Sequence, residues 1–287
     1  MGMKFKAICL VTVVVSMLSC GAKKDEGEII KHTTVGKDAL WEEEVLPQEE
    51  EEELALSEES TPSIDGVFND FLFAYLHSRT LRKERTANPL RLEHSERPAE
   101  MLEEFDPEFE FGFLSGDYFT TLYGNTSQMQ AEDDEELEED SIVSLQRINL
   151  NDGTIRNFLF MREGGRWQLD AIREGTFDED DLSDFLSFYS RFCSDSIFQS
   201  QSIADPLHIV LQDPEDEEES IDGIISADQW QTFCPEVPSG IISNIRKGQH
   251  YSGQKIVLRK SGLSNGLQEV FTFTKERTGW HLTRYEN

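Results

Sequence analysis

One short segment of the chain has the spacing of a serine nucleophile elbow. Gly262, Ser264 and Gly266 satisfy the pattern G-x-S-x-G. An elbow needs a buried strand before the serine and a helix after it. Here alternating apolar residues, typical of strands, lie on both sides, and Asn265-Gly266 is a strong signal for a tight β-hairpin. We therefore predict a hairpin turn at this segment and no catalytic serine.

Acidic and histidine side chains show no metal-binding pattern. The acidic runs 132–140 and 213–219 hold eight and six acids but no glycine, which a calcium loop of the form D-x-D-x-D-G requires. We interpret both runs as solvated loops. The cluster 178–181 lies just before a helical pattern and is expected to cap that helix. No histidine has the H-E-x-x-H spacing or a partner at ligand spacing, so we predict neither a metal nor another cofactor. The histidines are His32, His77, His94, His208, His250 and His281.

Four cysteines are candidates for covalent chemistry. Cys9 lies within an apolar leader and Cys20 at its end, whereas Cys193 lies on the apolar face of a predicted helix and Cys234 follows Trp230. An extracytoplasmic compartment permits a disulfide between Cys193 and Cys234. Two buried free thiols are the alternative, which we favour slightly because a distance cannot be read from sequence. The absence of C-x-x-C argues against a thioredoxin-like role.

The amino terminus has the features of a lipoprotein signal peptide over residues 1–19. Lys4 and Lys6 precede a twelve-residue apolar stretch, which is too short to span a bilayer. The stretch ends in Met17-Leu-Ser-Cys20, which resembles a bacterial lipobox, so we predict that Cys20 carries a lipid. An ordinary secretion signal is the alternative. Residues 21–26 resemble the surface-export signal of Bacteroidetes lipoproteins, which favours the cell surface over the periplasmic face of the outer membrane.

The net charge of the 287-residue chain is −31 at pH 7, from 26 Lys and Arg against 57 Asp and Glu. Much of this charge is local, because residues 21–60 hold 14 acids and 4 Lys. Like charges at this density extend a chain, so residues 20–62 are predicted to form a disordered acidic tether. Such an acidic protein repels phosphate, which excludes nucleic acid as a partner. The 19 Phe and 4 Trp provide enough apolar material for a folded core.

The chain after the tether contains one pattern twice. An amphipathic helix pattern recurs after 117 residues, and a hairpin pattern that ends in a tryptophan strand, with Trp167 or Trp280, recurs after 113 residues. The middles of the two copies differ, around 118–123 and around 230–245. We predict an α+β fold of two tandem modules, each a helix packed on a curved antiparallel sheet. The modules are expected over 63–175 and 176–287.

Three segments carry a resemblance to a known family, namely 185–207, 244–249 and 279–282. Over about 62–287 the chain resembles Bacteroidetes lipoproteins of domain-of-unknown-function family 4348, whose members look like the nuclear transport factor 2-like cone. The resemblance implies this fold and an envelope setting but no activity, because the fold hosts enzymes and scaffolds alike.

The concave face of a cone of this type can hold a ligand. The resemblance implies that an enzyme on this fold would use a carboxylate and a tyrosine there, for which Tyr118, Tyr123 and Asp195 are candidates. Aromatic residues at strand or helix spacing are more often core residues. We therefore assign a catalytic role to none of the three.

These observations favour a lipid-anchored protein of the cell envelope that binds a protein or a small ligand without catalysis. One alternative is a small-ligand receptor or enzyme that uses a cone pocket. Another is a structural or assembly factor whose cones are plugged. An open cone with convergent polar groups would support the first alternative, and cones filled with Phe and Trp side chains would support the second.

Overall fold

The computed structural model describes residues 64–133, 141–213, 219–233, 235–248, 251–262 and 266–287. The predicted signal peptide and tether lie outside these residues, as do Cys20, Cys234 and Ser264. Within the described part of the chain, no helix has both the length and the apolar character needed to cross a membrane.

The first repeat opens with two helices and continues with strands and short helical turns. The buried side chains of its first helix are Phe68, Phe71, Leu72 and Tyr75, which is the face that the helical spacing predicts. The elements are α1 (Phe68–His77), α2 (Arg79–Glu84), β1 (Thr86–His94), β2 (Glu100–Leu102), α3 (Pro107–Glu110), η1 (Gly112–Leu114), β3 (Tyr118–Tyr123), α4 (Thr126–Asp133), β4 (Ile142–Asn149), β5 (Thr154–Glu163) and β6 (Arg166–Thr176).

The second repeat follows the same order and differs in its middle. Helix α4 follows β3 in the first repeat, whereas the described residues between β9 and β10 form no helix. The elements are η2 (Phe177–Glu179), α5 (Ser183–Ser194), α6 (Ser196–Gln201), β7 (Ile203–Gln212), β8 (Ser220–Ile225), η3 (Ala227–Gln229), α7 (Trp230–Phe233), β9 (Ile241–Arg246), β10 (Lys255–Gly262), β11 (Gln268–Glu276) and β12 (Gly279–Glu286).

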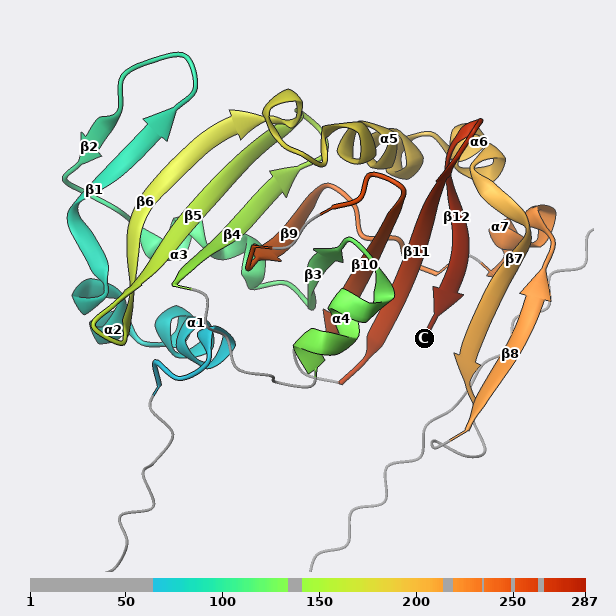
Figure 1. The fold of residues 1–287 in the computed structure, drawn as a ribbon, viewed down its shortest axis with the longest axis horizontal. Helices are drawn as coiled ribbons and strands as arrows, with labels where there is room; N and C mark the ends of the chain where they lie inside the picture. The colour runs from blue at the N-terminus through green and yellow to red at the C-terminus, as the bar shows by residue number, and fades with distance from the viewer. Residues whose placement is uncertain (1–63, 134–140, 214–218, 234, 249–250, 263–265) are drawn as a thin grey trace, which may run out of the picture. The chain divides into compact units, whose positions relative to one another are not determined.

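The two repeats build two six-stranded sheets and exchange one strand between them (Figure 1). Sheet A has the order β2-β1-β6-β5-β4-β9, and sheet B has the order β8-β7-β12-β11-β10-β3. Strand β9 of the second repeat therefore pairs with β4, and β3 of the first repeat pairs with β10. Neighbouring strands are antiparallel except for β1 with β6 and β7 with β12, which are parallel. The two α+β modules are thus present, and the exchanged strands interlock them.

The exchanged strands β3 and β9 bond to each other at equivalent positions. The backbone N–H of Thr120 donates to Ser243 Oγ (2.8 Å), and that of Ser243 donates to Thr120 Oγ1 (3.0 Å). Each hydroxyl in turn donates to the backbone carbonyl of the other residue, at 2.6 and 2.9 Å. Both residues are buried, so these bonds satisfy backbone groups that water does not reach. An approximate twofold axis therefore relates the two repeats at this contact.

Aromatic side chains fill the space between the helices and each sheet. Helix α1 packs Phe68 edge-on against Trp167 with 5.0 Å between ring centroids, and α5 packs Phe185 against Trp280 at 5.2 Å. Trp167 is 0% and Trp280 is 5% exposed, which confirms that the two tryptophans occupy equivalent buried places. The same cores also hold Phe71, Tyr75, Phe158 and Phe160 in the first repeat and Tyr189, Phe192, Phe271 and Phe273 in the second.

Both closing hairpins turn at a glycine, as predicted. Gly153, between β4 and β5, has φ +72°, and Gly266, between β10 and β11, has φ +66°. Glycine adopts this left-handed conformation without steric cost. The G-x-S-x-G segment therefore lies between two antiparallel strands, which confirms the hairpin and leaves no strand-to-helix elbow.

Candidate functional site

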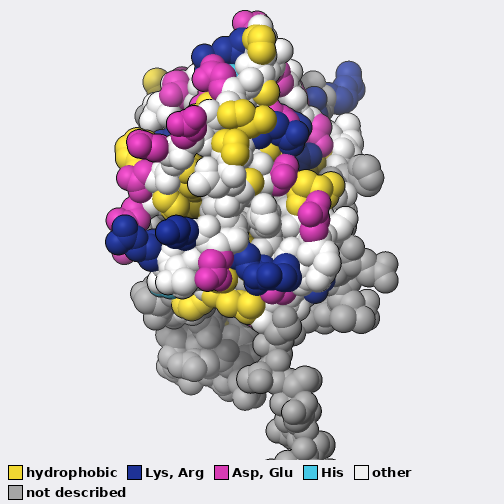
Figure 2. Space-filling model, turned by 90° about the vertical axis from the view of Figure 1, so that its left-hand side faces the viewer, with side chains coloured by type: hydrophobic (Ala, Val, Ile, Leu, Met, Phe, Trp, Pro, Cys, Tyr) yellow, Lys and Arg dark blue, Asp and Glu magenta, His cyan; other side chains and the backbone are white. Residues whose placement is uncertain are grey.

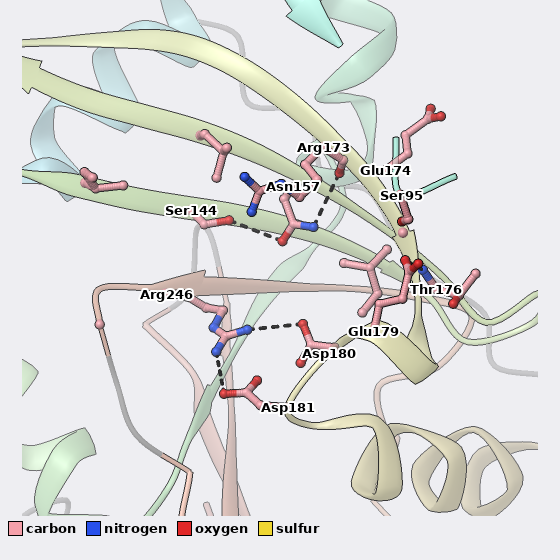
Figure 3. Close-up of a pocket in the computed structure, with 15 residues that line it drawn as sticks. Ser95, Ser144, Asn157, Arg173, Glu174, Thr176, Glu179, Asp180, Asp181 and Arg246 are labelled. Atoms are coloured by element: carbon pink, nitrogen blue, oxygen red, sulfur yellow. Dashed lines mark hydrogen bonds and ion pairs between the residues drawn. The ribbon is translucent and has the colours of Figure 1, made fainter. Parts of the chain in front are cut away.

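A pocket of about 600 Å³ lies on the face of sheet A that points away from α1 (Figure 3). Val143, Leu145 and Phe158 point into the α1 core. Because side chains alternate along a strand, the intervening residues of β4 and β5 point to the other face. The pocket floor is therefore formed by Ile142, Ser144, Asn157 and Leu159, and its wall by the segment between the repeats and by β9.

An arginine held by two aspartates forms this wall. Arg246 Nη1 donates to Asp180 Oδ2 at 3.1 Å, and Nη2 donates to Asp181 Oδ2 at 2.7 Å (Figure 3). The Asp180 side chain is 8% exposed, whereas that of Asp181 is 51% exposed. Burial raises the pKa of Asp180, although the nearby guanidinium of Arg246 acts in the opposite direction. The wall thus presents one buried and one accessible carboxylate.

The acidic cluster 178–181 does not cap α5, so this prediction is wrong. Leu182 is the N-cap residue of α5, and it makes no side-chain bond to the helix. Glu179 instead accepts a hydrogen bond from the backbone N–H of Thr176 (3.0 Å), and Asp180 accepts one from that of Leu182 (2.9 Å). Asp178 and Glu179 belong to the turn η2. Asp180 and Asp181 lie between η2 and α5, and their carboxylates bind Arg246.

Two buried amides connect the wall to both exchanged strands. Gln146 Nε2 donates to Asn157 Oδ1 (2.8 Å) and to Asp180 Oδ2 (3.2 Å). Asn244 Nδ2 donates to Gln146 Oε1 (2.8 Å), and Asn244 Oδ1 accepts from the backbone N–H of Leu122 (2.8 Å). Gln146 and Asn244 are fully buried. A satisfied buried network of this kind orients its members, so the strand exchange positions Asp180.

The charged groups around the pocket are each engaged with a neighbour. Four acids and two arginines line it, with an excess of negative charge. Arg173 pairs with Glu93 at 2.9 Å. Glu174 pairs with Arg156 and lies 3.0 Å from His94 Nδ1. The pocket therefore has charged groups held in place around a floor of apolar and polar side chains, a combination typical of binding sites.

The equivalent face of sheet B is covered by α4. Tyr123, Val257 and Val270 form a small buried cluster there, and Met129 of α4 packs against it. The covering helix is short, but its Met129 packs over the buried cluster and covers this part of the sheet. No such helix follows β9 among the described residues, so sheet A keeps its pocket.

Glu132 of α4 anchors the helix over sheet B. One carboxylate oxygen lies 3.1 Å from Lys247 Nζ, and the other lies 3.5 Å from Arg259 Nη2 and accepts a hydrogen bond from Tyr123 Oη. Its side chain is 15% exposed, so the interpretation of run 132–140 as a solvated loop is wrong at this residue. Burial alone would raise the pKa of Glu132, but Lys247 and the Tyr123 hydrogen bond outweigh burial and lower it.

The three residues considered for a cone-type active site lie apart. Tyr123 lies under α4, and Tyr118 lies with its ring centroid 4.9 Å from Lys260 Nζ. Asp195 is the N-cap of α6 and accepts hydrogen bonds from the next turn of backbone, at 3.1 and 2.9 Å. None of the three lines the pocket on sheet A.

Cys193 lies at the edge of the α5 core and is partly buried. Its Sγ donates to the carbonyl of Pro238 at 3.4 Å. Burial raises the pKa of the Cys193 thiol to about 12, which suppresses the nucleophilic thiolate. Cys234 lies outside the described residues, so the choice between a disulfide and two thiols stays a prediction.

The described residues contain no group of three or more His, Cys, Asp or Glu side chains arranged to hold a metal ion. His94 is a nearly buried histidine, with its side chain 6% exposed, and it lies between Glu174 and Glu100. His77 and His208 are exposed. His32 and His250 lie outside the described residues.

A second hollow, of about 860 Å³, lies between α2 and the segment 102–108. Figure 2 shows the side of the molecule on which β1 and β2 lie in Figure 1. Hydrophobic side chains gather there in patches separated by charged ones. Because the pocket on sheet A is the one tied into a buried polar network, we take it as the candidate site.

Sequence reasoning did not identify the residues of this pocket, although one signal was present. At the offset of 113 residues, Ser144 and Asn157 correspond to Val257 and Val270. Polar residues in one copy and valines in the other indicate that the same face has different surroundings in the two sheets. The role of Arg246 has no comparable signal, because it depends on which sheet receives β9.

The fold of this chain is similar to that of a solved bacterial protein. The crystal structure of an NTF2-like protein from Bacteroides fragilis matches with a TM-score of 0.68 and 28% sequence identity. The match covers 78% of this chain and 96% of that chain, so it includes both repeats. A comparison with curated proteins finds no match.

The amino-acid sequence also matches a family model over residues 48–287, which is most of the chain. The matched region includes every helix and strand described above. The chain therefore belongs to the family described as a domain of unknown function, DUF4348, and has an NTF2-like fold.

Proposed function

We propose that this chain is a non-catalytic binding protein of the cell envelope. A lipid on Cys20 anchors it to the outer membrane, facing the cell surface or the periplasm, and the acidic tether 20–62 holds the folded part away from the bilayer. The lipobox and the charge of the tether support this location. Its ligand, a small molecule or a protein segment, binds in the pocket on sheet A.

One observation carries the choice of site. The interiors between the helices and both sheets are occupied by aromatic rings, whereas the opposite face of sheet A offers about 600 Å³. That volume lies within the range of small-ligand sites, about 300–1,000 Å³. The charged groups of the pocket are held in ion pairs and hydrogen bonds, which supports recognition rather than proton transfer.

A structural or assembly role is the second candidate. The filled cones and the exchanged strands favour it, because both make the two modules one rigid support. In that case the pocket would stay empty in the cell. The two candidates therefore differ in whether the isolated protein carries a bound molecule.

Native mass spectrometry of the chain, gently extracted from its envelope, tests the binding role. We expect an added mass on the unaltered chain that is lost in Leu159→Trp, which fills the pocket floor without adding charge. The matched control Ile224→Trp changes an exposed residue of sheet B and should retain the added mass. Identical spectra for the unaltered chain and Leu159→Trp would reject the pocket as the site.

The anchor is tested separately in the same cells. Cys20→Ala should move the chain from the membrane to the soluble fraction and abolish the mass of the lipid. A Cys20→Ala chain that remains in the membrane with an unchanged mass would contradict lipid attachment at this residue.

A further inference from the structure

The pocket on sheet A is the place that α4 fills on sheet B. Strand register shows this, because Tyr123 lies opposite Val257 in sheet B and Arg246 lies opposite Ser144 in sheet A. Val257 and Ser144 are equivalent at the offset of 113 residues, and so are Val270 and Asn157. The side chains under α4 therefore correspond to side chains that line the pocket.

The connection between strands explains why one face is covered. Residues 124–141 join β3 to β4 and include α4, whereas residues 247–254 join β9 to β10. In the shorter connection, Gly248 lines the pocket, and none of the described residues belongs to a helix. Ile142, at the pocket floor, is consequently 55% exposed.

The polar half of the two faces is also equivalent, because each places a carboxylate beside an arginine, but the carboxylate comes from a different element. On sheet B the carboxylate of Glu132 comes from the covering helix and meets Arg259 and Tyr123. On sheet A the carboxylate of Asp180 comes from the wall and meets the equivalent residues, Gln146 and Arg246. The acid is thus already supplied by the protein, and Asp181 adds a second one that is half exposed.

We propose that the uncovered face of sheet A binds a short α-helical segment of a partner protein in the place that α4 occupies on sheet B. This inference rests on the proposed function of the pocket. An apolar side chain of the segment packs on Ile142 and Leu159. These residues flank Ser144 and Asn157, which correspond to the valines under Met129 on sheet B. A Lys or Arg side chain one turn further along the segment meets Asp181.

Charge complementarity selects this occupant over two others. The acidic tether, with 14 acids in residues 21–60, would bring like charge to a pocket lined by four acids. A second copy of α4 would bring Glu132 and the acids that follow it. A basic segment gains attraction at the rim, where an accessible ion pair directs register more than it adds affinity.

Selection from a displayed library of helix-constrained peptides, with all positions randomised, tests the proposal on the full chain in detergent. We expect enriched peptides with Lys or Arg three residues after an apolar residue, the spacing of Met129 and Glu132 in α4. Their affinity should fall at least tenfold for Ile142→Arg and for Asp181→Arg. It should also weaken as salt is added.

Matched controls separate a lost contact from a lost fold. Ile224→Arg and Glu163→Arg make the same changes at exposed positions of sheet B and of the far hairpin of sheet A, and both should bind normally. Ile142 is itself more than half exposed, so Ile142→Arg should unfold at the same urea concentration as the unaltered chain.

Any of four outcomes would overturn the proposal. If the selection enriches no peptide, a partner segment is excluded as the occupant. Enriched acidic peptides would point to the tether instead, and a dimer that is lost in Ile142→Arg would point to a second copy of the chain. A small molecule found by native mass spectrometry, with no peptide bound, would leave the proposed function standing and remove this inference alone.

Discussion

Replacement of Trp280 by alanine should destabilise both sheets, although Trp280 belongs to the second repeat. The indole is 5% exposed and packs against Phe185, and its Nε1 donates to Asp184 Oδ2 at 2.7 Å. Loss of a buried large aromatic residue costs about 3–5 kcal/mol. The substitution also removes the hydrogen bond to the Asp184 carboxylate. We therefore expect a loss of about 4 kcal/mol in the free energy of unfolding.

Strand exchange determines how this loss is distributed. If the second repeat unfolds, β9 leaves the edge of sheet A and β3 loses its partner β10. The buried network through Gln146 and Asn244 breaks at the same time. We therefore expect hydrogen exchange in β4, β5 and β6 to accelerate as much as in β10, β11 and β12. A loss of about 4 kcal/mol corresponds to roughly a thousandfold increase in the exchange rate of amides that open by global unfolding.

Hydrogen exchange read by mass spectrometry can compare the two sheets in one sample. Phe109→Ala is the control, because Phe109 is 82% exposed and its truncation should change neither sheet. Full protection of sheet A in Trp280→Ala, with protection lost in sheet B, would refute the coupling. The two repeats would then be independent despite the exchanged strands.

Three further predictions concern individual side chains. Val67→Asp should stabilise the protein by about 0.5–2 kcal/mol in urea unfolding, because Val67 is an N-cap without a side-chain bond. At the offset of 117 residues Val67 also corresponds to Asp184, which accepts from Trp280 Nε1, whereas Trp167 Nε1 is buried without a partner. An unchanged or lower midpoint would contradict this. The pKa of Glu132 is lowered on folding from its usual value of 4.5, so its charge contributes stability that is complete above that value and is lost as the pH falls below it. Glu132→Gln should therefore flatten the acid side of the stability profile, and a profile parallel to that of the unaltered chain would exclude this role. Cys193, with its raised pKa and partly buried side chain, should react with iodoacetamide at pH 8 only in denaturant, and peptide mapping without reductant would reveal a Cys193–Cys234 disulfide if one forms.

Local patterns in the sequence predicted the elements that depend on nearby residues. The helices α1 and α5 follow from apolar spacing, and the hairpins at Gly153 and Gly266 follow from turn chemistry. The strand exchange could not be predicted in this way. Strand β9 presents the same alternation to β4 as it would to β10, because a strand's pattern specifies its faces and not its neighbour.

The site followed the same limit. Asp180 and Asp181 form an acidic cluster in the sequence, but the arginine that they hold lies on an exchanged strand, 65 residues along the chain from Asp181. A helix cap depends only on neighbouring residues, so the sequence favours that interpretation of the cluster over an ion pair with a distant arginine. The acidic run beginning at Glu132 was misread for the same reason, since its partner Arg259 lies 127 residues away.

The exchange also makes the pocket a property of the pair of repeats. Its floor comes from β4 and β5 of the first repeat, and Arg246 comes from β9 of the second. The carboxylates that hold Arg246 come from the segment that joins the repeats. On sheet B, helix α4 of the first repeat covers the equivalent face. The described residues between β9 and β10 of the second repeat form no helix that could cover sheet A in the same way. Among the described residues, each repeat gives one strand to the other sheet, but only the first repeat also covers that sheet with a helix, and the pocket lies on the sheet without such a helix.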